Sequence, residues 1–334
     1  MDAQLLDNID ALHSIESQWS ALYEACPYAA PFQHPAWILP WWNAFGSGKV
    51  FTFAVWDGRR LLALLPAFLH EWEGRRQITL LGNGISDRLG PLAVPGHAEA
   101  AMPAILEALA RRASEWDVCS FEDLPADCGS MWEHRELIGK TIPYHVCACR
   151  RLPDSADALQ ASLPHGLRRN LRRYLDKMRS AGQVQFRCAA SEDEFETYLK
   201  ALFRLHACRW NQRGEPGMLS GALRSFHRES ALRLWRLGKA RCFALRLDGA
   251  PIAAIYGFSD KQRFWSYQSG FDPAMMEYSP GSLILNFAME QAIAEGNRIF
   301  DFLRGDERYK RDWGTEFECN RHMMMWHSKE RAAE

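Results

Sequence analysis

The chain has 334 residues, of which 47% are hydrophobic and 24% charged, and its formal net charge is −1. This length exceeds what one hydrophobic core usually serves, so we expect two domains. The near-zero charge gives the whole chain no attraction for nucleic acid or membranes. No uncharged apolar run approaches the roughly 20 residues of a membrane-spanning helix.

The N-terminus and the cysteines predict a cytoplasmic protein. The first residues, Met1-Asp2-Ala3-Gln4-Leu5, are acidic and lack the basic and apolar regions of a signal peptide. The nine cysteines are odd in number and scattered among apolar residues, as reduced thiols are. Their spacing matches no zinc pattern, so we expect no metal.

The first half of the chain mixes helical and extended patterns. Apolar residues at helical spacing predict helices over 10–25, 35–46 and 98–115. Runs typical of strands lie at 50–55, 61–69, 77–81, 118–121 and 145–150. Asp57-Gly58, between the first two runs, is a strong hairpin signal.

The second half repeats this order of elements. Helices are predicted over 162–181, 191–209, 219–237, 280–295 and 306–311. Strands are predicted over 184–188, 241–247, 252–258, 263–270, 298–302 and 316–326. Ser191-x-x-Glu194 is a capping box, and Asp248-Gly249 is a second hairpin turn. We therefore expect a mixed α/β fold with domains at 1–152 and 153–334.

The turn Ser279-Pro280-Gly281-Ser282 lies between a strand and a helix. Proline suits the first turn of a helix, and glycine lets the backbone approach a ligand closely. Unpaired N–H groups at such a helix start favour a phosphate, so the turn is a candidate pyrophosphate site. The alternative is an ordinary loop-to-helix turn.

Asp301 lies on the apolar strand Ile299-Phe300-Asp301-Phe302. A buried acid is costly unless it is paired, and the nearby cations are Arg304, Arg308 and Lys310. Two interpretations remain open. Asp301 either accepts the proton of an acceptor group or forms a structural ion pair.

Two further groups are candidates for the same site. His206 and Trp210 are four residues apart on one helix face, with Arg209 beside them, and this face would line an acceptor pocket. Lys310 would face a phosphate or carboxylate, and Tyr309 would donate a hydrogen bond to a developing charge. The alternatives are a favourable helix end and a solvated, charged helix.

The helix predicted at 162–181 is strongly basic. Its cations are Arg168, Arg169, Arg172, Arg173, Lys177 and Arg179. Such a row meets an RNA or another anionic polymer in some proteins, and is a solvated face in others.

Taken together, these segments resemble the CelD-like or BioF2-like acetyltransferases, a branch of the GNAT superfamily close to the FemAB peptidyltransferases. The resemblance covers nearly the whole chain and depends on the order of its motifs. These include Phe32-Gln33-His34-Pro35-Ala36-Trp37, Trp41-Trp42-Asn43, Leu205-His206, Tyr267-Gln268-Ser269-Gly270-Phe271-Asp272, Ser279-Pro280-Gly281, Phe300-Asp301-Phe302-Leu303-Arg304-Gly305 and Tyr309-Lys310.

The resemblance implies two tandem GNAT-like domains, the first degenerate and the second carrying acyl-CoA. The pantetheine would lie between the splayed strands 263–270 and 298–302, with the pyrophosphate at Ser279–Ser282. Gln268, Ser269 and Gly270 would contact the donor. Arg209, Trp210, Arg304 and Lys310 would bind the acceptor.

The predicted function is acyl transfer, with acetyl as the expected group, from acyl-CoA to an amine or hydroxyl of a small molecule or a polysaccharide or cell-envelope precursor. Asp301 or His206 would take the acceptor proton, and Tyr267 or Tyr309 would protonate the thiolate. FemAB relatives use aminoacyl-tRNA, so a tRNA-dependent transferase is one alternative. A non-catalytic acyl-CoA-binding or scaffold protein is the other. The acceptor, acyl length and oligomeric state stay open.

Overall fold

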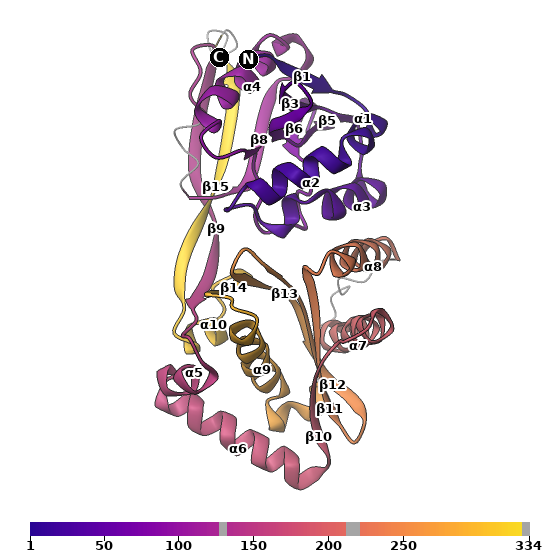
Figure 1. Ribbon diagram of the computed structural model, residues 1–334, viewed down its shortest axis with the longest axis vertical. Helices are drawn as coiled ribbons and strands as arrows, with labels where there is room; N and C mark the ends of the chain where they lie inside the picture. The colour runs from indigo at the N-terminus through magenta and orange to yellow at the C-terminus, as the bar shows by residue number, and fades with distance from the viewer. Residues whose placement is uncertain (127–131, 212–220, 329–334) are drawn as a thin grey trace. The chain divides into compact units, whose positions relative to one another are not determined.

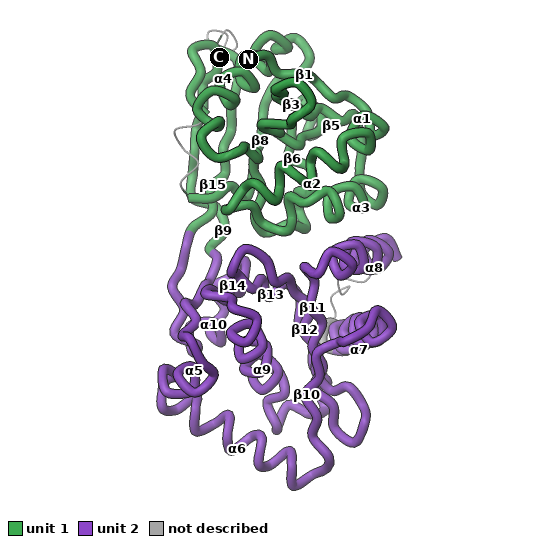
Figure 2. Tube along the Cα trace, viewed as in Figure 1, with its two compact units in different colours: residues 1–146, 319–334 green, residues 147–318 purple. Residues whose placement is uncertain are grey.

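The computed structural model describes residues 1–126, 132–211 and 221–328, and for residues 209–211 it describes the backbone alone. The chain forms two compact units (Figure 2). Unit 1 comprises Met1–Val146 and Cys319–Glu334, and unit 2 comprises Cys147–Glu318. Strands β9 (Leu137–Arg151) and β15 (Glu316–His327) each contribute residues to both units. The domain boundary at 152/153 stays a prediction.

Unit 1 packs its helices against strands that are antiparallel except for the parallel pair β6 and β8 (Figure 1). The helices are α1 (Ile9–Ser14), α2 (Glu16–Ala25), η1 (Pro31–Gln33), α3 (Pro35–Phe45), α4 (Ala98–Ala110) and η2 (Ala113–Glu115). The strands are β1 (Ala3–Leu6), β2 (Lys49–Val50), β3 (Thr52–Asp57), β4 (Arg60–Leu65), β5 (Ala67–Trp72), β6 (Arg75–Leu80), β7 (Leu92–Ala93) and β8 (Val118–Leu124). They form the orders β1-β3-β4-β7 and β15-β8-β6-β5-β2.

Tryptophans anchor the core of unit 1. Trp19, Trp37 and Trp116 are each at most 1% exposed. Their ring N–H groups donate to the Gln33 carbonyl, the Ser86 hydroxyl and the Leu109 carbonyl. Each buried indole thus keeps its hydrogen bond, which makes these residues structural rather than ligand-binding plates.

Unit 2 is a mixed sheet with helices on both faces. The helices are α5 (Ala156–Ser162), α6 (His165–Ala181), α7 (Glu192–Asn211), α8 (Gly221–Arg236), η4 (Pro273–Tyr278), α9 (Pro280–Ala294) and α10 (Arg308–Asp312). The strands are β10 (Val184–Cys188), β11 (Ala240–Leu247), β12 (Ala250–Asp260), β13 (Arg263–Phe271) and β14 (Ile299–Arg304), in the order β10-β11-β12-β13-β14-β9. Figure 1 shows α9 on one face and α7 and α8 on the other.

The predicted signals correspond to real features. Asp57 and Arg60 close the β3–β4 hairpin, and Gly249 at φ +83° turns β11 into β12. The Ser191 hydroxyl accepts a hydrogen bond from the Glu194 amide at 3.2 Å, so α7 begins with the predicted cap. The mixed α/β class is confirmed.

The prediction of one strand over 61–69 is wrong, because Pro66 interrupts the strand. Residues before Pro66 form β4, which pairs with β3 and β7, and those after it form β5, which pairs with β2 and β6. Proline has no N–H for a ladder, so it separates two strands that belong to different sheets. Strand β1 and helix α5 were not predicted.

In the described part of the chain, no helix combines the length and apolarity needed to cross a bilayer.

Candidate functional site

Strands β13 and β14 of unit 2 run parallel for a short distance and then part. The parallel register begins at Arg263 opposite Ile299 and ends at Trp265 opposite Asp301. Beyond it, β13 continues along β12, and β14 continues along β9. The facing edges of β13 and β14 therefore turn backbone N–H and C=O groups toward the gap between them.

The divergence coincides with an irregularity in β14. Leu303 has φ +61°, in the left-handed region, and the register with β9 shifts between Asp301 and Arg304. A left-handed conformation costs an L-residue with a branched side chain roughly 1–2 kcal/mol, so it persists only where the surroundings enforce it. The bulge bends β14 where its pairing with β13 ends.

Helix α9 begins close to the end of β13, to which η4 connects it. Ser279 at φ +46° and ψ +51° precedes Pro280, which occupies the first turn as predicted. A Cβ placed on Gly281 would lie 3.2 Å from the ring of Phe271, the last residue of β13. Glycine therefore permits close approach of the helix start to the strand end, and the helix dipole there favours an anion.

Comparisons with known proteins address this unit and the whole fold. Residues 165–311 match the family model described as an acetyltransferase (GNAT) domain. The chain is similar to FemX, with 11% identity, 99% of this chain and 98% of that chain covered, and a TM-score of 0.71. Residues 165–311 are therefore a GNAT-like domain, and the chain as a whole shares the fold of FemX. No curated protein matches it.

Two further solved structures share the fold of this chain. One is the C-terminal domain of a predicted lysylphosphatidylglycerol synthetase from Agrobacterium fabrum, at 12% identity, with 96% of this chain and 94% of that chain covered, and a TM-score of 0.61. The other is L-PGS from Bacillus licheniformis, at 10% identity, with 93% of this chain and 91% of that chain covered, and a TM-score of 0.57. The narrower CelD-like assignment stays a prediction.

Asp301 is fully buried in the GNAT-like domain, and both carboxylate oxygens are engaged. Oδ2 forms an ion pair with the Arg263 guanidinium at 2.7 Å, and Oδ1 accepts the Leu303 amide at 2.8 Å. Arg263 also lies over the Trp265 ring, 5.0 Å from its centroid. The ion-pair partner thus comes from the neighbouring strand, whereas the sequence suggested cations that follow Asp301. The arrangement favours the structural interpretation of this acid.

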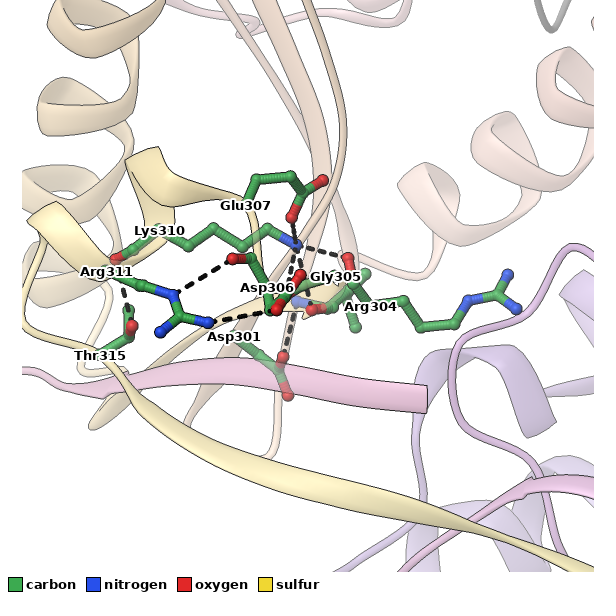
Figure 3. Close-up of polar contacts among 9 residues, drawn as sticks. Asp301, Arg304, Gly305, Asp306, Glu307, Lys310, Arg311 and Thr315 are labelled. Atoms are coloured by element: carbon green, nitrogen blue, oxygen red, sulfur yellow. Dashed lines mark hydrogen bonds and ion pairs between the residues drawn. The ribbon is translucent and has the colours of Figure 1, made fainter. Parts of the chain in front are cut away.

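Lys310 points at backbone carbonyls (Figure 3). Its ammonium group donates to the carbonyls of Leu303 at 3.3 Å, Arg304, and Gly305 at 3.4 Å, and pairs with Glu307 at 3.0 Å. The side chain is 3% exposed. Lys310 therefore closes the turn after β14, and the predicted role in acceptor binding has no support from this geometry.

His206 belongs to a buried cluster on the α7 and α8 face of β13. His227 of α8 lies 5.6 Å from the Tyr267 ring, and Tyr267 lies 5.8 Å from the Tyr256 ring. Burial, with a smaller contribution from neighbouring His206, lowers the pKa of His227 to about 3. His227 is therefore neutral at physiological pH.

Gly270 connects this cluster to the strand. A Cβ there would lie 3.0 Å from the His206 backbone nitrogen and 3.3 Å from the side chains of Leu202 and Leu205. Glycine is thus required for β13 to pack against α7, in the half of the strand that diverges from β14. Its predicted contact with the donor stays a prediction.

The other predicted residues are dispersed. Ser269 is exposed, whereas Gln268 is half-buried opposite Tyr256. Tyr309 is 46% exposed on α10, and the Arg304 side chain extends away from Lys310 (Figure 3). The predicted side chains of Arg209 and Trp210 lie outside the described residues.

Sequence reasoning missed Arg263 and His227. Arg263 is a strand-start residue whose partner is 38 positions away, and only the parallel register brings the pair together. His227 has a weak signal, since it shares a helix face with apolar Leu223, Ala231 and Leu234. Among the described residues, no group of three or more His, Cys, Asp or Glu side chains is placed to hold a metal.

Proposed function

We propose that unit 2 transfers an acyl group from acyl-CoA, with acetyl-CoA as the donor, to an amine or hydroxyl of a small molecule or saccharide precursor. The divergence of β13 and β14 beside the start of α9, within the segment that matches the GNAT model, carries this proposal. The pantetheine arm would pair with the edges of the two strands. The pyrophosphate would bind at Ser279–Ser282.

The chemistry requires few side chains. The acceptor nitrogen or oxygen attacks the thioester carbon, and a backbone N–H within Tyr267–Gly270 stabilises the oxyanion. Collapse of the tetrahedral intermediate breaks the C–S bond. His206 takes the acceptor proton, because Asp301 is already engaged by Arg263 and the Leu303 amide. Tyr309, which is partly exposed, supplies a proton to the thiolate more readily than buried Tyr267.

Calorimetric titration with acetyl-CoA tests the donor assignment. Gly281→Trp would fill the space between α9 and Phe271 and should abolish micromolar binding. Gly166→Trp is the matched control, because a Cβ there meets nothing within 4 Å. No binding to the parent protein, or equal binding to Gly281→Trp, would refute the proposal. Saturable binding without turnover on a panel of acceptors would indicate the non-catalytic acyl-CoA-binding protein instead.

Helix α6 supports a second candidate, an aminoacyl-tRNA-dependent transferase. The helix carries six Lys and Arg side chains against Asp176 alone, on a chain whose net charge is −1. Its apolar side, with buried Leu171 and Met178, packs within unit 2, and most of the cations face outward. Five of the six cations are arginines, which suit bidentate phosphate contacts.

Filter binding of charged tRNA across a salt series distinguishes this candidate. Replacing Arg168, Arg169, Arg172 and Arg173 by Ala should lower the slope of log affinity against log salt by about 3. Replacing four arginines of α8, namely Arg224, Arg228, Arg233 and Arg236, is the control. Equal losses in both variants, or no tRNA binding to the parent, would exclude the tRNA-dependent reaction.

A further inference from the structure

We infer that Lys310 and Asp301 act as a two-sided clamp on the bulge at Leu303, and that this clamp positions β14 so that the gap beside β13 stays open. The inference deepens the proposed function, because the gap is the proposed acyl-donor slot. Both side chains are positioning residues in this assignment, and neither contacts the reacting atoms.

The first support is the strain at the bulge. Leu303 is 2% exposed and holds φ +61°, and Gly305, two residues on, holds φ +109°. A relaxed strand would continue beyond Asp301 in register with β13, as parallel strands do over longer stretches. Some part of the surroundings must therefore hold residues 303–305 out of that register.

Asp301 fixes the entrance to the bulge. Its Oδ1 accepts the amide hydrogen of Leu303, two residues ahead, while Oδ2 is tied to Arg263 on β13. Asp301 is also the last β14 residue in the parallel register. One carboxylate thus joins the strands where they meet and imposes the bend where they part.

Lys310 fixes the exit. Carbonyls of three successive residues, Leu303, Arg304 and Gly305, converge on one ammonium group (Figure 3). An ammonium has three N–H donors, so these contacts together with Glu307 use its capacity. Turning Lys310 toward a bound phosphate would leave the carbonyls without this donor, at a cost expected for buried polar groups.

Lys310→Met tests the clamp. It keeps the length and apolar stem of the side chain but removes the donor. We expect amide exchange of residues 301–306 to accelerate about tenfold or more, while β11 and β12 keep their protection. The dissociation constant for acetyl-CoA should rise about tenfold, as KM rather than kcat. Arg308→Met, on the first residue of α10, removes an exposed cation of the same helix and should change neither quantity.

A second variant, Gly305→Ala, tests whether the effect of Lys310→Met comes from the lost positive charge alone. Gly305 holds φ +109°, a backbone conformation that strains any residue with a Cβ, so Gly305→Ala should loosen the same turn with Lys310 intact. Unchanged exchange at 301–306 in Lys310→Met would overturn the clamp. So would a loss confined to kcat with normal donor binding, since it would place Lys310 at the reacting atoms. Exchange reports on the clamp even if the parent binds no acyl-CoA, so failure of the proposed function is recognised separately.

Discussion

Units 1 and 2 contain the same β-α-β arrangement. They differ in the segment that connects the first strand to the helix and in what contacts the end of the second strand. In unit 1, β6 and β8 are parallel from Gln77–Val118 to Thr79–Ser120, as β13 and β14 are in unit 2. Asp123 of β8 has φ +55°, and the register with β15 shifts beside it. Each unit therefore ends its short parallel register before a left-handed residue in the second strand.

The connections to the helix are different. In unit 2, residues 272–279 lead directly into α9. In unit 1, the longer segment 81–97 intervenes before α4, and it binds the end of β8. The Leu89 amide donates to the Asp123 carbonyl at 3.0 Å, and the Asn320 side chain donates to the Asp87 carbonyl at 2.8 Å and the Asp123 carboxylate at 3.0 Å. In unit 1, residues of the same unit therefore form the hydrogen bonds at the end of β8.

This comparison shows which features belong to the shared fold and which are found in unit 2. A bulged strand after a short parallel register is common to both units, so it does not by itself indicate a ligand site. The feature found in unit 2 is the bulge combined with a helix start that glycine allows close to the strand end. We accordingly propose the donor site for unit 2 and a supporting role for unit 1.

Removing the Asp301 charge should have the largest effect. Asp301→Asn breaks the pair with Arg263, whose side chain is one fifth exposed, and should lower the free energy of unfolding by about 2–4 kcal/mol. Urea unfolding checks the stability, and calorimetry should show weaker acetyl-CoA binding. If instead kcat falls about 10²-fold with stability and binding unchanged, Asp301 is the proton acceptor.

Asn320→Ala is the corresponding change in unit 1. Asn320 is 1% exposed and bridges Asp87 and Asp123, so its loss should cost about 1–3 kcal/mol of stability. Acetyl-CoA affinity should stay within a factor of about two. A large drop in affinity, at a temperature where circular dichroism shows the variant folded, would give unit 1 a part in donor binding.

His227 should give unit 2 an acid-sensitive stability. In the folded protein it stays neutral until the pH nears 3, because burial lowers its pKa, whereas the unfolded chain takes up the proton near 6.5. The unfolded state binds more protons between these values, so lowering the pH through this window should lower the free energy of unfolding by up to about 1.4 kcal/mol per pH unit. Urea titrations between pH 4 and 7 measure the slope.

His227→Phe keeps a ring of similar shape against Phe226 and Tyr267 and removes the titration. Its stability should vary less steeply with pH than the parent's. Exposed His13→Asn serves as the control and should leave the slope unchanged. Parallel curves for the parent and His227→Phe would mean that the buried histidine does not govern the acid response.

The smallest effects are expected at the paired hairpins. Gly58 and Gly249 hold φ +57° and +83° in the two hairpin turns, and a Cβ would collide with nothing at either site. Each Gly→Ala change should cost about 1 kcal/mol, from backbone strain alone. Thermal unfolding of the two variants should shift about equally. A markedly larger loss at one turn would show that the units depend differently on their hairpins.

The sequence was most informative where structure is locally determined. The Asp-Gly hairpins, the Ser191 cap and Pro280 at the start of α9 follow from residues a few positions apart. Helix α5 was missed although Ser155 caps it by accepting from the Ala158 amide, because Pro153 and Pro164 frame too short an apolar pattern.

The interactions of the candidate site depend on pairing across the sheet. Asp301 was correctly identified as a buried acid that needs a partner, but Arg263 becomes that partner only through the strand register. Lys310 was predicted to face a phosphate or carboxylate, yet besides Glu307 it contacts three backbone carbonyls, which no residue pattern distinguishes. The left-handed backbone conformation of Leu303 and Ser279 could likewise not be predicted from the sequence, since neither residue type favours a positive φ.

Strand β15 gives the order of synthesis a consequence for assembly. Its residues from Cys319 onward belong to unit 1, and Asn320 among them is buried against Asp87 and Asp123. These residues leave the ribosome after all of unit 2. Unit 1, which begins first in the chain, is therefore completed last, and a nascent chain halted before Cys319 would hold the whole of unit 2 but an unfinished unit 1.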